Sequence, residues 1–323
     1  MVAAAFIGNT SVSAQQDLCS DSGKSLESAL DSYIDGDYAR AQPILDCIVD
    51  RGRPEHRLFA RFYLARIYAD NNGNMTDHAR AYALFTDIVN EYGRRMDPEN
   101  RRLSPFVARA ITEVGRYVLR GVPAAAVRPN SALASELFQL AASVFDEPNA
   151  QFELAKLLLV GDGVERDPKL SFHYLQSLSQ RSHAGAQAFF ADRLWRGQTV
   201  AGRDPVTALA LARLAVNNAQ PSDRIWIEDI YQNIYCGAST SIRSEASGQV
   251  ASWSRAFLRP DGTGSIRAPT PDLQPERALR FTRTCADGEV VDLSPLVPTA
   301  DQPMAGNFKG DVRPAGQQRS SDR

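Results

Sequence analysis

The sequence predicts an all-α protein built as a solenoid of stacked helix pairs. The clearest segment, residues 150–187, reads as a helix, a Gly-Asp-Gly turn, a second helix and the start of a third helix. Small residues stand where the two helices must touch, at Ala155 in the first and Ser171 in the second. One unit later, residues 190–191 read Phe-Ala where residues 154–155 read Leu-Ala. A helix pair that recurs in this way buries its apolar face only against a neighbouring pair.

Four predicted second helices share one register. Each begins at a polar N-cap candidate and has a small residue four positions later. Further residues of the same face follow at offsets 7 and 11. In the order N-cap, offset 4, offset 7 and offset 11, the four sets are Asp77, Ala81, Leu84 and Ile88; Asn130, Ala134, Leu137 and Ala141; Asp167, Ser171, Tyr174 and Leu178; and Asp204, Ala208, Leu211 and Ala215. We expect the small residue to let the paired helix approach, and the bulky residues to fill the layer between repeats.

The predicted first helices carry a matching pair of residues at positions 64–65, 114–115, 154–155 and 190–191. A related unit precedes them from Leu26, with a tight Asp-Gly-Asp turn at 35–37. Helices are also expected at 221–236 and 243–258. Only the connections vary in length, with insertions at 92–102 and 121–129. The sequence predicts about five helix pairs, more than the three or so that a stable stack needs.

Three segments follow from this layout. Residues 1–14 are typical of a truncated secretion signal, since a short apolar stretch precedes Val-Ser-Ala at 12–14. Residues 25–258 form the solenoid. Residues 259–323 hold eight of the 18 prolines and little apolar content near the end, which predicts a largely disordered tail. Within the tail, residues 278–293 could form a hairpin that turns at Asp287-Gly288.

The four cysteines are consistent with export, where an even number permits three disulfide connectivities. Cys19 precedes the first helix pair and Cys47 lies on its second helix, so a bridge between them would close the N-terminal end of the stack. Cys236 lies near the last repeat and Cys285 in the tail, so a second bridge would tie the tail down. The alternative is four unpaired thiols.

Composition and motifs argue against several kinds of function. A net charge of -2 does not favour a nucleic-acid partner, and no run of about 18 apolar residues suggests a membrane span. The four histidines, at positions 56, 78, 173 and 183, lack the spacing of metal ligands. The Gly-Asp-Gly at 161–163 is too short for a calcium loop, and no Gly-Lys-Ser/Thr follows to make a phosphate loop. We therefore expect no catalytic residues, no metal and no cofactor.

The expected functional surface is the groove lined by the first helices. Mapping these helices onto the geometry of tetratricopeptide repeats gives eleven groove-facing residues, many of them arginine or aromatic. They are Phe62, Arg66, Arg109, Arg116, Arg120, Phe152, Lys156, Leu159, Asp192, Trp195 and Arg196. Arginine and aromatic side chains dominate the energetics of protein interfaces. The alternative is that Phe62 and Phe152 pack between repeats and that the arginines are solvated.

These units resemble Sel1-like repeats, cousins of the tetratricopeptide repeat, and residues 150–183 match the GxGV-xxD and A-xx-Y-xxx-A pattern closely. Residues 106–123, 137–163, 182–186 and 221–226 further resemble the exopolysaccharide regulator family of α-proteobacteria, over roughly residues 26–236. The resemblance implies a periplasmic, non-enzymatic protein. It would bind the periplasmic domain of a membrane sensor histidine kinase, hold it inactive and so control exopolysaccharide production. The long tail and the four cysteines depart from that family.

Two other functions remain open from the sequence. An exported Sel1-like scaffold could assemble envelope or secretion components. An enzyme of the cysteine-rich Sel1-like group would be expected to carry a cysteine pair in each repeat, and the middle repeats here have none.

Overall fold

The computed structural model describes residues 21–71, 73–93, 97, 100–257, 284–291 and 293. Within these residues the secondary structure is helical apart from two isolated antiparallel bridges. The helices, in chain order, are α2 (Ser22–Ile34), α3 (Tyr38–Arg51), α4 (Pro54–Ala69), α5 (His78–Tyr92), α6 (Ser104–Arg120), η1 (Pro123–Ala125), α7 (Ser131–Phe145), α8 (Pro148–Val160), α9 (Pro168–Gln180), α10 (Ala184–Trp195), α11 (Pro205–Asn218), α12 (Arg224–Gly237) and α13 (Thr240–Phe257). The predicted all-α solenoid is confirmed.

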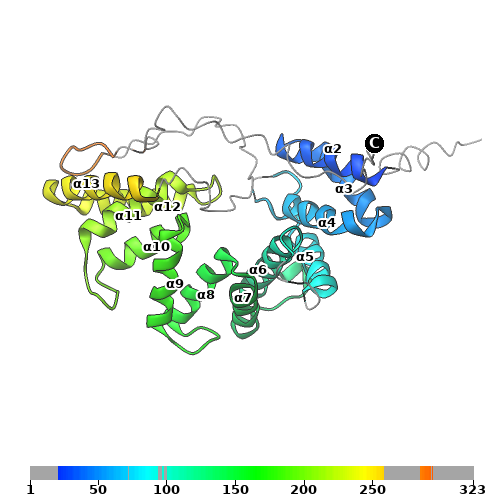
Figure 1. Ribbon diagram of the computed structural model, residues 1–323, viewed down its shortest axis with the longest axis horizontal. Helices are drawn as coiled ribbons and strands as arrows, with labels where there is room; N and C mark the ends of the chain where they lie inside the picture. The colour runs from blue at the N-terminus through cyan, green and yellow to red at the C-terminus, as the bar shows by residue number, and fades with distance from the viewer. Residues whose placement is uncertain are drawn as a thin grey trace, which may run out of the picture.

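The helices follow one another along an open arc, from α2 at one end through α6 and α7 to α13 at the other (Figure 1). Five pairs pack as expected, α2 with α3 through to α10 with α11. The sixth is irregular, because α13 packs against α11. No described helix is long and apolar enough to cross a membrane.

The predicted N-caps are confirmed, and each cap residue also bonds to the preceding helix. The side chains of Asp77, Asn130, Asp167 and Asp204 each accept a hydrogen bond from the backbone N–H three residues on, at 3.0 Å. The backbone N–H of each cap also donates to a carbonyl in the last turn of the paired first helix, at 2.8–3.2 Å. We call this two-way connection the cap clasp. It fixes the start of each second helix against the end of its partner.

The small residues bring the paired helices together as predicted. The residues at offset 4 are fully buried in all four repeats, and so are those at offset 11. In the third repeat the Ser171 hydroxyl donates to the Ala155 carbonyl at 2.7 Å, which bonds the two helices directly. A Cβ added to Gly115 would lie 2.6 Å from the Phe138 ring, so these helices leave no room for a methyl group there.

The residues at offset 7 pack against the core in three of the four repeats, but the residues next to them are buried more deeply. Leu84, Leu137 and Tyr174 are half-buried, while the residues at offset 8, Phe85, Phe138 and Leu175, are fully buried. At about 100° per residue, offsets 7 and 8 lie on opposite flanks of the apolar stripe. The flank at offset 8 faces the paired helix, as the contact between Gly115 and Phe138 shows, and therefore takes the large side chains.

The core is continuous along the arc. Buried apolar residues form one cluster from α2 to α8, a second around Phe152 and Phe172, and a third from α10 to residue 291. Tyr174 packs against the first and second clusters, and Phe190 and Trp226 pack against the second and third. Each repeat is therefore stabilised by its neighbours.

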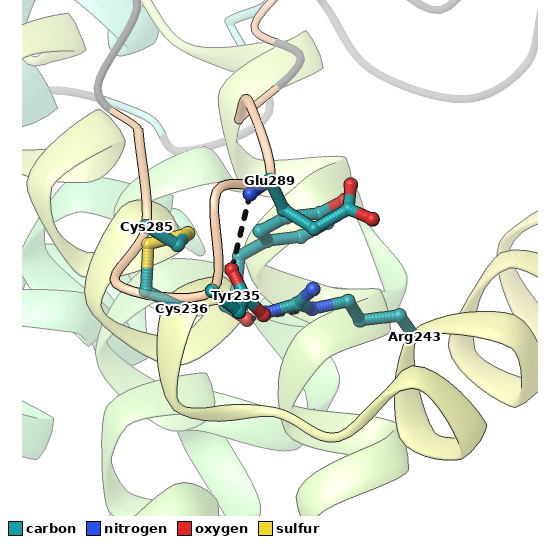
Figure 2. The surroundings of a disulfide bond; sticks show 6 residues. Tyr235, Cys236, Arg243, Cys285 and Glu289 are labelled. Carbon is teal, nitrogen blue, oxygen red and sulfur yellow. Dashed lines mark hydrogen bonds and ion pairs between the residues drawn. A yellow bond between two sulfur atoms is a disulfide. The ribbon is translucent and has the colours of Figure 1, made fainter.

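The cysteine pair Cys236 and Cys285 is joined by a disulfide (Figure 2). It holds residues 284–291 against α12 and α13, where Val291 is 1% exposed and Arg243 pairs with Asp287 at 2.8 Å. This segment turns at Asp287-Gly288, where the predicted hairpin appears as one antiparallel bridge. Residues 1–14, Cys19 and most of the predicted tail lie outside the described residues, so the expected Cys19–Cys47 bridge stays a prediction.

Candidate partner-binding surface

The even-numbered helices form the inner row of the arc. Helix α2 contacts α4, α4 contacts α6, α6 contacts α8, and α10 contacts α12. Among the described residues, consecutive odd-numbered helices from α3 to α11 make no comparable contact with one another. Rows that approach more closely lie on the shorter, concave side of a curved stack. The inner row therefore presents the concave surface that a partner would meet (Figure 1).

Charged residues recur in register on two inner helices. Helix α6 carries Glu113 and Arg116 on either side of its Val-Gly pair, and α8 carries Glu153 and Lys156 on either side of its Leu-Ala pair. Spacings of three place each acid beside a base on one helical face. Because the repeats stack in register, the same positions of α6 and α8 also lie side by side.

These four residues form one ion-pair network. Arg116 Nη1 lies 2.7 Å from Glu113 Oε1, and Arg116 Nε lies 3.0 Å from Glu153 Oε1. Lys156 Nζ lies 2.5 Å from Glu153 Oε2. The Glu153 side chain is only 7% exposed, so its two oxygens are served by protein cations and hardly by water. The network links consecutive repeats across the concave surface.

Electrostatics reinforces the charged state of this network. Burial raises the pKa of Glu153, but the charges of Arg116 and Lys156 outweigh it and hold the pKa below its usual value. Burial lowers the pKa of Arg116, yet Glu113 and Glu153 outweigh that effect and raise the pKa. The charge of Asp223, at the start of α12, acts on Arg116 in the same direction. The inner helices α6 and α8 and the start of α12 thus share one set of charges.

His183 lies beside this network as the N-cap of α10. Its Nδ1 accepts a hydrogen bond from the backbone N–H of Ala186 at 3.1 Å, and its Nε2 lies 3.3 Å from Asn149 Oδ1. The ring can serve as this cap only while Nδ1 is unprotonated. Burial and the positive charge of Arg116 lower the pKa of His183 to about 4, against the opposing charges of Asp223 and Glu153.

We expect His183 to make the protein less stable as the pH falls. An unfolded histidine titrates near pH 6.5, so between pH 6.5 and about 4 the unfolded chain takes up the proton more readily. The stabilisation is fully present above pH 6.5 and is lost toward pH 4, by at most about 3 kcal/mol. Urea unfolding at several pH values measures this loss of stability.

The variant His183→Asn, which can cap the helix without titrating, should reduce the dependence of the unfolding free energy on pH. The matched control is His173→Asn, on the exposed face of α9. An unchanged slope in the first variant would contradict the assignment.

The structure places nine of the eleven predicted groove residues at the surface of the inner row. Arg66, Arg120 and Arg196 are exposed. Half-buried positions are held by Arg109, Arg116, Lys156, Leu159, Asp192 and Trp195. Several are held in place: Arg66 Nε donates to the Tyr33 hydroxyl at 3.0 Å, and Arg196 Nε pairs with Asp192 at 2.7 Å.

The two predicted aromatic anchors on α4 and α8 are corrected by the structure. Phe62 is 3% exposed and packs edge-on against Phe85 and Phe106, with ring centroids 5.9 and 5.1 Å away. Phe152 is 7% exposed and packs edge-on against Phe189. Both residues fill the space between neighbouring repeats, because an inner-row residue that points along the arc meets the next helix and not solvent.

Sequence reasoning missed Glu113, Glu153 and His183. It also missed Arg166 and Arg193, which line a hollow between α8 and α10. A signal for the acids was present, since Glu-Val-Gly-Arg and Glu-Leu-Ala-Lys occupy equivalent positions of two repeats. The capping histidine gave no such signal. No group of three or more His, Cys, Asp or Glu side chains in the described ranges could hold a metal ion.

A match to a known repeat family agrees with this architecture. The family model described as Sel1 repeat matches residues 108–143 and 148–183, which contain all four residues of the ion-pair network. Among solved structures, a protective antigen of uropathogenic Escherichia coli that displays an SLR fold matches with 19% identity and a TM-score of 0.44 over 77% of this chain and 57% of that one. A Sel1 repeat protein from Oxalobacter formigenes matches with 16% identity and a TM-score of 0.44 over 65% of this chain and 81% of that one.

Two curated relatives are similar in sequence. Both are described as exopolysaccharide production negative regulators, one from Rhizobium leguminosarum bv. viciae and one from Rhizobium meliloti (strain 1021). Each is 29% identical over 188 residues, which is 58% of this chain. The matched part spans about two thirds of the relatives, 67% of the first and 66% of the second. The chain thus contains two segments that match the Sel1 repeat, and it is similar in sequence to negative regulators of exopolysaccharide production.

Proposed function

We propose that this chain is a non-enzymatic regulator that acts in the periplasm and lowers exopolysaccharide production. It binds the periplasmic domain of a membrane sensor histidine kinase and holds the kinase inactive. The observation that carries the proposal is the similarity over 188 residues to negative regulators of exopolysaccharide production. The charged concave surface of the inner helices supports a protein partner, since arginine-rich, partly desolvated surfaces are typical of interfaces.

The mechanism is a shift in population. A regulator that binds the inactive kinase more tightly than the active kinase stabilises the inactive state by the difference in binding free energy. A shift from mostly active to mostly inactive kinase needs a ratio of affinities of about 10⁴. Loss of the regulator returns the kinase to its own equilibrium, so no reaction at the surface is required.

We expect the purified full chain to capture the kinase's periplasmic domain, and charge reversal on the concave surface to weaken that binding. Arg120→Glu with Arg196→Glu changes two exposed inner-row cations, and should lower the affinity about tenfold or more. Biolayer interferometry measures the dissociation constant. Lys169→Glu reverses an exposed cation on α9, in the outer row, and should leave it unchanged.

A cell-based experiment completes the test. Deletion of the gene should cause excess exopolysaccharide, which the wild-type gene restores to normal and the double charge-reversal gene does not. If the periplasmic domain fails to bind, the kinase assignment is wrong. If only envelope or secretion components are captured, the chain is a scaffold instead.

A further inference from the structure

A hollow of about 260 Å³ opens between α8 and α10. The side chains of Lys156, Leu159 and Val160 come from α8, and Arg166 comes from the loop that follows it. Phe189 and Arg193 of α10 form the other side. The hollow adjoins the ion-pair network through Lys156, and lies at the middle of the predicted groove.

The hollow is positively charged and has no acid of its own. Three of its lining residues are cations and none is a carboxylate. Two nearby acids are each shared between two cations: Glu153 pairs with Arg116 and Lys156, and Asp192 pairs with Arg196 at 2.7 Å and more loosely with Arg193 at 3.9 Å. The local charge therefore favours an anion.

Arg166 and Arg193 are held in place by other residues and still have N–H groups that can donate to a ligand. Arg166 Nε donates to the Leu159 carbonyl at 3.1 Å, which fixes the side chain and leaves its two terminal nitrogens. Arg193 lies 4.7 Å from the Phe189 ring centroid and donates from Nη1 to Gln198 at 2.5 Å. A guanidinium has five N–H donors, so both retain hydrogen-bonding capacity. Side chains fixed in advance lose less entropy when they bind an oxyanion.

The rest of the lining is apolar and sets the size of the ligand. Leu159 and Phe189 are half-buried, and Val160 is 67% exposed beside them. Sites for whole small molecules usually measure about 300–1,000 Å³, so a hollow of about 260 Å³ suits one or two side chains. Inorganic phosphate would leave the apolar part unfilled. An acidic residue next to an apolar residue would use both parts.

We propose that this hollow binds an acidic peptide segment of the protein partner, through one Asp or Glu carboxylate. Arg166 and Arg193 hold the carboxylate, and an adjoining apolar side chain packs on Leu159, Val160 and Phe189. The inference rests on the proposed function in one respect, that the ligand belongs to a protein partner. It adds the chemistry that the partner must present.

A labelled peptide tests the site without the kinase. The probe is a fluorescein-labelled acetyl-Leu-Glu-Phe-Glu-Leu amide, and its control carries glutamine in place of both glutamates. Fluorescence anisotropy with the full chain should show binding that is at least tenfold weaker for the glutamine peptide. Arg166→Glu should lower the affinity at least tenfold, and Arg193→Gln should also lower it. Lys169→Glu serves as the matched surface control, and circular dichroism confirms that each variant is folded.

The outcomes separate this inference from the proposed function. Equal binding of the two peptides, or full binding by folded Arg166→Glu, overturns the acidic site. So does direct binding of an anionic polysaccharide, such as polygalacturonate, to a chain that does not bind the peptide. Kinase binding that survives Arg166→Glu, together with no peptide binding, leaves the proposed function standing and removes this site. Peptide binding without kinase binding supports the site and contradicts the kinase assignment.

Discussion

Replacing Gly163 with alanine is expected to destabilise the protein by more than about 3 kcal/mol. Gly163 has φ +69, a left-handed conformation that costs an L residue about 1–2 kcal/mol. An added Cβ would also lie 2.2 Å from the backbone carbon and oxygen of Ser131, at the start of α7. Because that neighbour is backbone, no change of rotamer relieves the overlap. Urea unfolding of the full chain measures the loss of stability.

A second glycine isolates the conformational part of this loss. Gly202 has φ +84, and a Cβ there would meet nothing within 4 Å. Gly202→Ala should therefore cost only the left-handed conformation, about 1–2 kcal/mol. A Gly163→Ala variant as stable as Gly202→Ala would show that the contact with Ser131 does not constrain the loop. The Gly163 carbonyl also accepts a hydrogen bond from the Ser135 hydroxyl at 2.7 Å. Displacement of the Gly163 loop would therefore break a hydrogen bond between neighbouring repeats.

Replacing Glu153 with glutamine should cost about 3 kcal/mol. Arg116 and Lys156 would lose the carboxylate that neutralises them on a partly desolvated surface. The neutral amide would leave both cations without their counter-charge, and its N–H₂ group would face one of them. The measurement is again the free energy of unfolding, at low and at moderate salt.

The control for this variant lies on the neighbouring helix. Glu113→Gln removes one contact to Arg116, from a side chain that is 33% exposed, and should cost less than about 1 kcal/mol. The double variant Arg116→Met with Glu153→Leu removes both buried partners and should recover part of the loss. Equal effects of Glu113→Gln and Glu153→Gln would show that the network does not depend on the buried acid.

The solenoid could be predicted because its determinants are local. A polar cap, a small residue at offset 4 and an apolar residue at offset 11 each act within one helix pair, so a single sequence reveals them. The sequence did not reveal that offset 8 is buried more deeply than offset 7, because this depends on the direction of the neighbouring helix. That direction is a tertiary property. The irregular packing of α13 against α11 is tertiary for the same reason.

The candidate site was predictable only in part. The exposed arginines were found because they stand at corresponding inner-row positions. Phe62 and Phe152 were misplaced because their exposure depends on how closely the next repeat approaches. The importance of Glu153 could not be deduced from α8 alone, because the residue that makes its burial tolerable, Arg116, belongs to the preceding repeat. The cap function of His183 depends likewise on Asn149 from another helix.

The cap clasp has a consequence for how such a chain can lengthen. It closes four connections of eight to eleven residues, at 69–76, 119–129, 159–166 and 195–203, onto the same arrangement of helix ends. The entropy of closing a loop rises only slowly with its length. Outside the closely packed turn at Gly163, extra sequence in these connections should therefore cost little and leave the curvature of the arc unchanged. They are the natural positions for an inserted tag or reporter, and the points at which relatives can acquire new loops.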